Sequence, residues 1–296
     1  MEVELPSRFT RESMYPFINQ ILDEEMLPRD EKIIFDFRPL EFIQPVGITV
    51  LSNLIGKLQK HGSSVSFRYR KPNKKNKWCT MSYLDDSMFF KSYLNETLDS
   101  TSALRATTLP LENVVYDRSY QYLDNAMEWL ALKLSLSKES LGDIKTCLKE
   151  VFNNIKDHSS ENNGFIFIQQ FAKKNLVTVA ISDFGIGIPS SVQTKHPSLN
   201  DAEALIKAVE EGFTTKSTPR NRGAGLAFLL HNVVNNNKGD VYIHSNSGIL
   251  CCNHNGEHMV ISSELSEGFY PGTLLELNFR TDTIEYVKED FSWDDY

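Results

Sequence analysis

The spacing of apolar residues divides this chain of 296 residues into helical and extended segments. Helical spacing predicts helices over 10–26, 51–58, 117–136, 141–155 and 202–211, the last capped by Asn200 or Asp201. Short β-rich runs predict strands at 32–37, 65–70, 164–171, 176–181 and 274–279. The third and fourth strands, joined by a short loop, should form an antiparallel pair. Because helices and strands occur along the whole length, the pattern predicts an α/β fold.

The pattern breaks between positions 97 and 108, where serine, threonine, alanine and leucine follow one another without periodicity. We interpret this break as a domain boundary. Before it, a strand, a helix and a strand follow in the order expected of a crossover unit on a small sheet. The expected organisation is a small α/β domain over 1–105, a larger α/β domain over 106–281 and an acidic tail over 282–296.

Composition and charge narrow the function classes. Hydrophobic residues make up 41% and charged residues 24% of the chain, which is ordinary for a globular protein. A net charge of −8 argues against general nucleic-acid binding. A basic loop over 68–78, with Tyr69 and Trp78 interleaved, is the segment suited to a nucleic-acid backbone. We favour the interpretation that this loop is simply solvated.

Targeting and redox signals favour the cytoplasm. The chain does not open with the basic and then apolar segment of a signal peptide, and no run approaches the roughly 18 apolar residues that a membrane span needs. The four cysteines lack the spacing of a disulfide framework. We therefore expect a cytoplasmic protein with no membrane contact.

The first chemical motif is an E-x-x-x-N-x-x-x-H pattern inside the helix predicted over 141–155 and just beyond it. Glu150, Asn154 and His158 recur at one-turn spacing, so they form a stripe beside the apolar face. An amide oxygen such as that of Asn154 suits Mg²⁺, which takes only one or two protein ligands beside substrate phosphates. A carboxylate one turn away can orient or deprotonate a water molecule.

Two glycine motifs follow. In the D-x-G-x-G motif, Asp183 stands at a strand exit, where it can accept a hydrogen bond from an exocyclic amino group, while Gly185 and Gly187 let the backbone approach a planar base. In the G-x-G motif, Gly223 and Gly225 open an apolar helical segment. The free N–H groups at such a helix start suit phosphate.

The polar segment over 212–222 lies between these motifs and carries three cations and four hydroxyl residues. We interpret it as a lid that closes on triphosphate oxygens. Lys216 is the preferred contact to the γ-phosphate, with Thr215 and Arg222 next. An ordinary solvated loop is the alternative.

In this order, the motifs resemble those of the GHKL ATPase superfamily, which includes sensor histidine kinases, anti-sigma serine kinases, type II topoisomerase ATPase domains and heat-shock chaperones. The resemblance covers about 116–280 and implies a mixed sheet packed on helices. It implies the following roles: general base for Glu150, magnesium ligand for Asn154, adenine recognition for Asp183 with Gly185 and Gly187, phosphate binding for Gly223 and Gly225, and support of the adenine site for Thr273, which follows Gly272.

The segment over about 33–69 resembles a STAS domain in its strand, loop, helix and closing glycine. Regulatory members of that family carry a phosphorylatable serine or threonine just before the helix glycine. Here those positions are Gln44, Pro45 and Val46, so no hydroxyl is present. The resemblance therefore implies a docking or structural role for this domain.

Together these observations predict an α/β ATPase domain of the GHKL type behind a STAS-like domain, with ATP and Mg²⁺ as ligands. The first hypothesis is that the protein hydrolyses ATP and acts as a nucleotide-gated regulatory switch. The alternatives are a serine/threonine protein kinase of the anti-sigma partner-switching type and a non-catalytic, ATP-gated interaction module. In each case we expect a protein partner, and a homodimer is compatible with the sequence.

Overall fold

The computed structural model describes residues 1–76, 78–115, 119–158, 163–213 and 225–288, and at 114–115, 119, 154–158 and 163 it describes the backbone alone. Within this part of the chain, the strands form sheets of three, five and two strands. Helices and strands both occur along the whole length of this part of the chain, so the predicted α/β class is confirmed.

The N-terminal part contains, in chain order, β1 (Glu2–Glu4), β2 (Arg8–Phe9), α1 (Met14–Ile21), β3 (Lys32–Asp36), β4 (Phe42–Ile43), α2 (Pro45–Lys60), β5 (Ser64–Arg68), α3 (Thr80–Asp86) and α4 (Phe89–Leu94). The parallel sheet has the order β1-β3-β5, and α2 connects β3 to β5. The predicted crossover unit is therefore confirmed. Helix α1 is shorter than the helix predicted over 10–26, because Leu22 already has extended backbone.

Helix α2 begins at Pro45, earlier than the sequence suggested. Proline presets a helical φ and lacks the N–H that a first helical turn leaves unpaired, so this position suits it. Gly47 lies inside the first turn, where an added Cβ would come within 2.9 Å of side-chain atoms of Phe9 and Ile43. The lack of a side chain at Gly47 therefore allows the helix to pack closely on β2 and β4.

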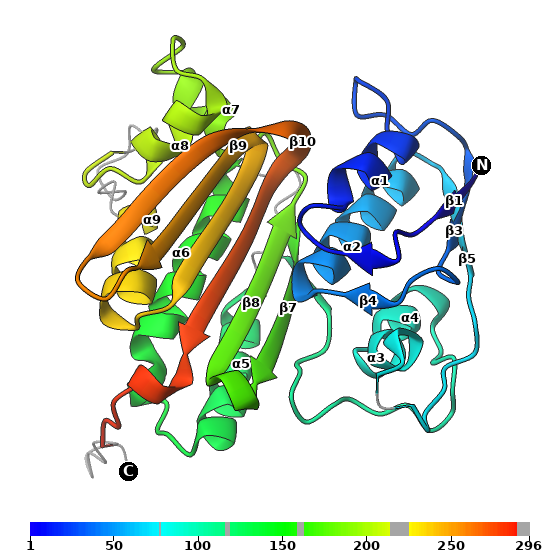
Figure 1. The fold of residues 1–296 in the computed structure, drawn as a ribbon, viewed down its shortest axis with the longest axis horizontal. Helices are drawn as coiled ribbons and strands as arrows, with labels where there is room; N and C mark the ends of the chain where they lie inside the picture. Colours follow the sequence, from blue (N-terminus) through cyan, green and yellow to red (C-terminus); the bar gives the residue numbers. More distant parts are fainter. Residues whose placement is uncertain (77, 116–118, 159–162, 214–224, 289–296) are drawn as a thin grey trace.

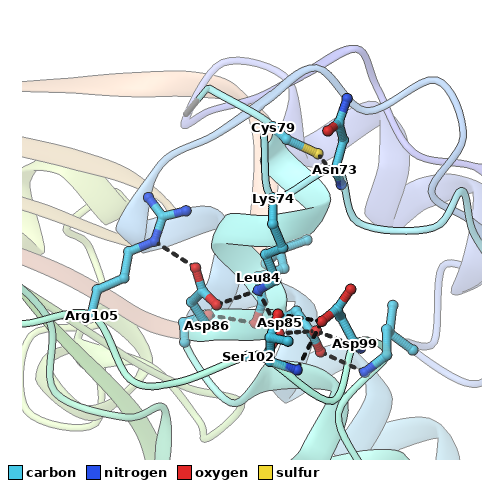
Figure 2. Close-up of polar contacts among 12 residues, drawn as sticks. Asn73, Lys74, Cys79, Leu84, Asp85, Asp86, Asp99, Ser102 and Arg105 are labelled. Carbon is cyan, nitrogen blue, oxygen red and sulfur yellow. Dashed lines mark hydrogen bonds and ion pairs between the residues drawn. The ribbon is translucent and has the colours of Figure 1, made fainter. Parts of the chain in front are cut away.

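Two adjacent carboxylates on α3 hold the segment that links the two predicted domains (Figure 2). Asp85 is fully buried and accepts the backbone N–H groups of Leu98 at 2.8 Å and Asp99 at 3.0 Å. Asp86 accepts a hydrogen bond from Arg105 Nε at 3.0 Å. The link is thus anchored by charge-assisted hydrogen bonds, which are stronger than neutral ones.

Ion pairs also engage the basic loop over 68–78. Lys74 Nζ lies 2.5 Å from a carboxylate oxygen of Asp86, and Arg68 pairs with Glu2. These cations are partly neutralised within the chain, which supports the interpretation of the loop as a solvated surface element rather than a nucleic-acid site.

The C-terminal part contains β6 (Glu112–Val115), α5 (Ser119–Leu134), α6 (Gly142–His158), β7 (Asn163–Phe171), β8 (Leu176–Asp183), α7 (Ile188–Gln193), α8 (Asp201–Ala208), α9 (Gly225–Leu230), the π-helical η4 (His231–Asn236), β9 (Asp240–His254) and β10 (Met259–Arg280), with short 3-10 turns at Glu139–Leu141, Ala172–Lys174 and Thr281–Thr283. The sheet order is β6-β7-β8-β10-β9, and every neighbouring pair described is antiparallel, so the predicted β7–β8 pair is confirmed. The mixed sheet that the resemblance implied is wrong for the strands described, because none of them lies parallel to its neighbour. Among the helices described, none is both long and apolar enough to cross a lipid bilayer.

The central part of the five-stranded sheet is buried on both faces. Val179 and Ile181 of β8 belong to the core that includes α5 and α6, whereas Ala180 belongs to the core shared with the N-terminal part. Figure 1 shows α5 and α6 behind the sheet, α2 beside β7 and β8, and α1 beside the end of β10. Strands covered on both faces are apolar at successive positions rather than at alternate ones. This explains why β8 is buried at every residue after Leu176.

A buried polar contact joins α1 to β9 at this interface. The Tyr15 hydroxyl contacts His244 Nδ1, and His244 Nε2 lies 3.0 Å from the carbonyl oxygen of Asn246. A carbonyl can only accept, so Nε2 carries the proton and Tyr15 donates to Nδ1. Burial lowers the pKa of His244 to about 4, which keeps the ring neutral.

Acidification should destabilise the fold through His244. Its folded pKa of about 4 lies below the value of 6.5 for an exposed histidine, so the unfolded chain binds the proton more tightly. The contribution of His244 to stability is complete above pH 6.5 and is lost as the pH falls from 6.5 toward 4. The loss sums to about 3 kcal/mol, at roughly 1.4 kcal/mol per pH unit. Urea unfolding across this range measures the free energy of unfolding of both proteins. This free energy should depend less on pH in His244→Gln than in the wild type.

Comparing the two proteins at each pH isolates this effect. Burial raises the pKa of Glu276, so this group works in the opposite direction, but both proteins retain it. His258→Gln is the matched control, because His258 is exposed on the β9–β10 hairpin and should leave the pH dependence as in the wild type. An unchanged pH dependence in His244→Gln would contradict the assignment.

Candidate functional site

Asp183 ends β8 and is oriented by its own turn. Its side chain is buried, and Oδ1 accepts the backbone N–H of Gly185 at 2.7 Å. This bond fixes the carboxylate relative to the glycine turn. Because side chains alternate along a strand, Asp183 lies on the same face as Ile181, which is the face covered by α5 and α6.

The turn leaves no room for a side chain at Gly187. Its φ is +81°, a conformation that favours glycine, and an added Cβ would lie 2.5 Å from Asn246 Oδ1 and 2.9 Å from Ser245 Oγ. The next residue, Ile188, begins α7 and donates its N–H to Ser245 Oγ at 2.9 Å. The glycine turn is therefore packed directly on β9.

Strand β10 places Thr273 opposite Asp183. The two residues are partners in the antiparallel register, and directly opposed residues share a face of the sheet. The preceding Gly272 has a φ of +114°, and an added Cβ would lie 2.4 Å from the carbonyl oxygen of Asp183 and 2.6 Å from the nitrogen of Gly185. The structure thus brings the aspartate turn and the glycine–threonine pair together.

The hydroxyl of Ser245 connects the ends of these strands. Ser245 Oγ donates to the carbonyl oxygen of Gly272 at 2.6 Å and accepts the N–H of Ile188. It also lies 3.1 Å from Thr273 Oγ1. A hydroxyl has one proton and two lone pairs, so Thr273 is the donor in this last bond. Thr273 Oγ1 consequently keeps its lone pairs as acceptors on the Asp183 face.

Glu150 lies on α6 against the start of α9. Its side chain is half-buried, and an added Cβ on Gly225 would lie 3.0 Å from Glu150 Oε2. The first and third motifs of the sequence are therefore in contact in the folded chain. The lack of a side chain at Gly225 leaves the carboxylate beside the backbone of the helix start.

Other predicted residues lie outside the described part of the chain. These are Thr215, Lys216, Arg222 and Gly223, which fall within 214–224. Asn154 belongs to α6, of which only the backbone is described at that position. The lid, the phosphate contacts and the magnesium ligand stay predictions.

Two oxygen acceptors suited to an amino group lie at the ends of β8 and β10. Asp183 and Thr273 hold these opposed strand positions, and the space that a side chain at Gly187 would take is filled by Asn246 and Ser245. Among the described residues, no group of three or more histidine, cysteine, aspartate or glutamate side chains is arranged for a metal ion.

Sequence reasoning did not identify Ser245 and Asn246. Asn246 Nδ2 donates to Ser190 Oγ at 2.8 Å, so both residues tie β9 to the segment after Asp183. The available signal was the run of small polar residues after His244, which interrupts the apolar pattern of β9. Asn246 also has a φ of +53°, which asparagine tolerates better than most residues.

A scan of protein-family models and a search of curated proteins both find no match to this chain.

Proposed function

We propose that this chain binds ATP together with Mg²⁺ and acts as a nucleotide-gated regulatory switch, with hydrolysis at Glu150. The observation that supports this most is the pairing of Asp183 with Thr273 on the helix-covered face, beside a tightly packed glycine turn. The contact between Glu150 and the helix start at Gly225 adds to it. The order of the motifs, which resembles that of GHKL ATPases, gives independent support.

In this proposal each group has a defined chemical task. Asp183 accepts a hydrogen bond from the exocyclic amino group of adenine, and Thr273 supplies a second acceptor nearby. Backbone N–H groups at the start of α9 bind phosphate, and Asn154 is the ligand of Mg²⁺. Glu150 orients or deprotonates the attacking water, and positioning and electrostatics supply most of the remaining rate enhancement in phosphoryl transfer.

One experiment separates the candidate functions. Purified protein is incubated with γ-labelled ATP and Mg²⁺, and free phosphate, phosphorylated protein and intact nucleotide are separated. Release of free phosphate supports hydrolysis, whereas label on the chain or on an added protein supports a kinase. Bound but intact ATP supports the non-catalytic module, and no binding at all rejects the proposal.

Asp183→Asn should weaken ATP binding and reduce the preference for ATP over GTP. The amide can present a donor where adenine also presents one, so a charge-assisted hydrogen bond is lost. The expected cost is about 1.5–3 kcal/mol of binding free energy. Titration calorimetry with ATP and GTP measures both quantities.

Asp240→Asn is the matched control for this prediction. Asp240 begins β9 and pairs with Asn278, at the end of the sheet opposite to Asp183. Its substitution removes the same charge from the same sheet and should leave ATP affinity unchanged. Equal ATP affinities of Asp183→Asn and the wild type would show that Asp183 does not bind adenine.

A further inference from the structure

Neighbouring residues at the end of β8 face opposite sides of the sheet. Asp183 faces the helices, whereas Ser182 faces the N-terminal part. There, Ser182 Oγ accepts a hydrogen bond from Nδ2 of Asn53 on α2. Both side chains are buried, so this hydrogen bond satisfies polar groups that bulk water does not reach. A residue of the N-terminal part thus holds the backbone that carries the proposed adenine-reading carboxylate.

A second contact acts on β9 in the same way. Tyr15 on α1 donates to His244, whose backbone continues directly into Ser245. Ser245 in turn fixes Ile188 and Gly272, which flank the glycine turn and Thr273. On both β8 and β9, the residue bonded to the N-terminal part is therefore the direct neighbour of a site residue that lies on the opposite face of the sheet.

A third polar contact across this interface lies away from the site. The Tyr83 hydroxyl donates to Gln169 Oε1 at 2.6 Å. Gln169 of β7 is opposite Thr178 of β8, four positions before Ser182. At about 3.3 Å per residue this is roughly 13 Å along the strand. The chain thus contains its own control: an interface hydrogen bond of the same kind that touches no site residue.

We infer that Asn53 and Tyr15 of the N-terminal part are positioning residues for the nucleotide site, so that docking of α1 and α2 and binding of nucleotide are energetically coupled. The reference to nucleotide rests on the proposed function. The proposed positioning keeps the turn after Asp183 and the residue Ser245 well ordered. It can be tested without any ligand. Such coupling is reciprocal, so nucleotide should also tighten the contact of the N-terminal part with the sheet.

Hydrogen exchange read by mass spectrometry on the nucleotide-free full chain tests the positioning. The informative amides are those of Gly185 and Ile188, which bond to Asp183 and Ser245. In Asn53→Ala and Tyr15→Phe these amides should exchange about five- to tenfold faster, as expected for loss of one buried hydrogen bond. In Tyr83→Phe they should exchange at the wild-type rate.

The double variant Asn53→Ala/Ser182→Ala separates a specific bond from general loosening. If Asn53 acts through Ser182, the double variant should exchange no faster than the faster single variant. Tyr15→Phe removes a single oxygen atom and keeps the inference testable if Asn53→Ala fails to fold. Wild-type exchange in both variants, or equal acceleration in Tyr83→Phe, would overturn the inference.

Binding of a fluorescent ATP analogue forms the second arm. Asn53→Ala and Tyr15→Phe should bind about fivefold or more weakly, and Tyr83→Phe within about twofold of the wild type, following the same hydrogen-bond cost. A wild-type protein that binds no nucleotide rejects the proposed function, while the exchange result still decides the positioning. Tight binding by the wild type with equal affinities in all variants rejects the coupling alone.

Discussion

Glu150→Gln should abolish ATP turnover while the protein still binds ATP. The amide keeps the size of the side chain beside Gly225 but cannot accept a proton from water. Loss of a general base typically costs about 10²–10⁴-fold in rate. A coupled assay of phosphate release gives the rate, and binding of a fluorescent ATP analogue gives the affinity, so that chemistry and binding are read separately.

Asp143→Asn is the matched control, because Asp143 is an exposed carboxylate in the first turn of the same helix. It removes an equal charge from α6 and should turn over ATP at the wild-type rate. A Glu150→Gln protein with wild-type turnover would show that another group activates the water. If the wild type binds ATP without turnover, Glu150 has no catalytic role and the non-catalytic switch is favoured.

Gly272→Ala should strongly destabilise the fold and remove nucleotide binding. Its φ of +114° is one that residues with a Cβ rarely adopt, and the new methyl would lie 2.4 Å from the carbonyl oxygen of Asp183. Conformational strain of about 1–2 kcal/mol and overpacking of about 1–3 kcal/mol add to roughly 2–5 kcal/mol. This is a large part of the 5–15 kcal/mol typical of a folded domain.

Gly256→Ala separates these two causes. Gly256 has a similar φ of +102° in the β9–β10 hairpin, but nothing lies within 4 Å of an added Cβ. Only the strain of about 1–2 kcal/mol should remain, and ATP binding should be unchanged. Urea unfolding and ATP titration on both variants measure the difference. Equal destabilisation by the two substitutions would show that the contact with Asp183 is not important.

The sequence alone determined the features that depend on near neighbours in the chain. The β3–α2–β5 unit and the β7–β8 pair follow from apolar spacing and short connections. The start of α8 was predicted to within one residue, with Asn200 or Asp201 as the cap, and the capping box between Asn200 and Glu203 selects Asn200. Asp183 and Gly187 are predicted from local turn chemistry at a strand end, whereas the role of Thr273 is implied only by the resemblance to GHKL ATPases.

Only the tertiary structure decided which of these segments meet. The register of β10 on β8 places Thr273 opposite Asp183, and the packing of α9 on α6 places Gly225 against Glu150. The run of small polar residues after His244 distinguishes Ser245 within β9, but its role depends on partners from α7 and β10, which local sequence does not reveal. Burial of the second sheet face by α1 and α2 was not predicted either. Whether an apolar strand is covered on one face or on both depends on the placement of distant segments, which local periodicity does not encode.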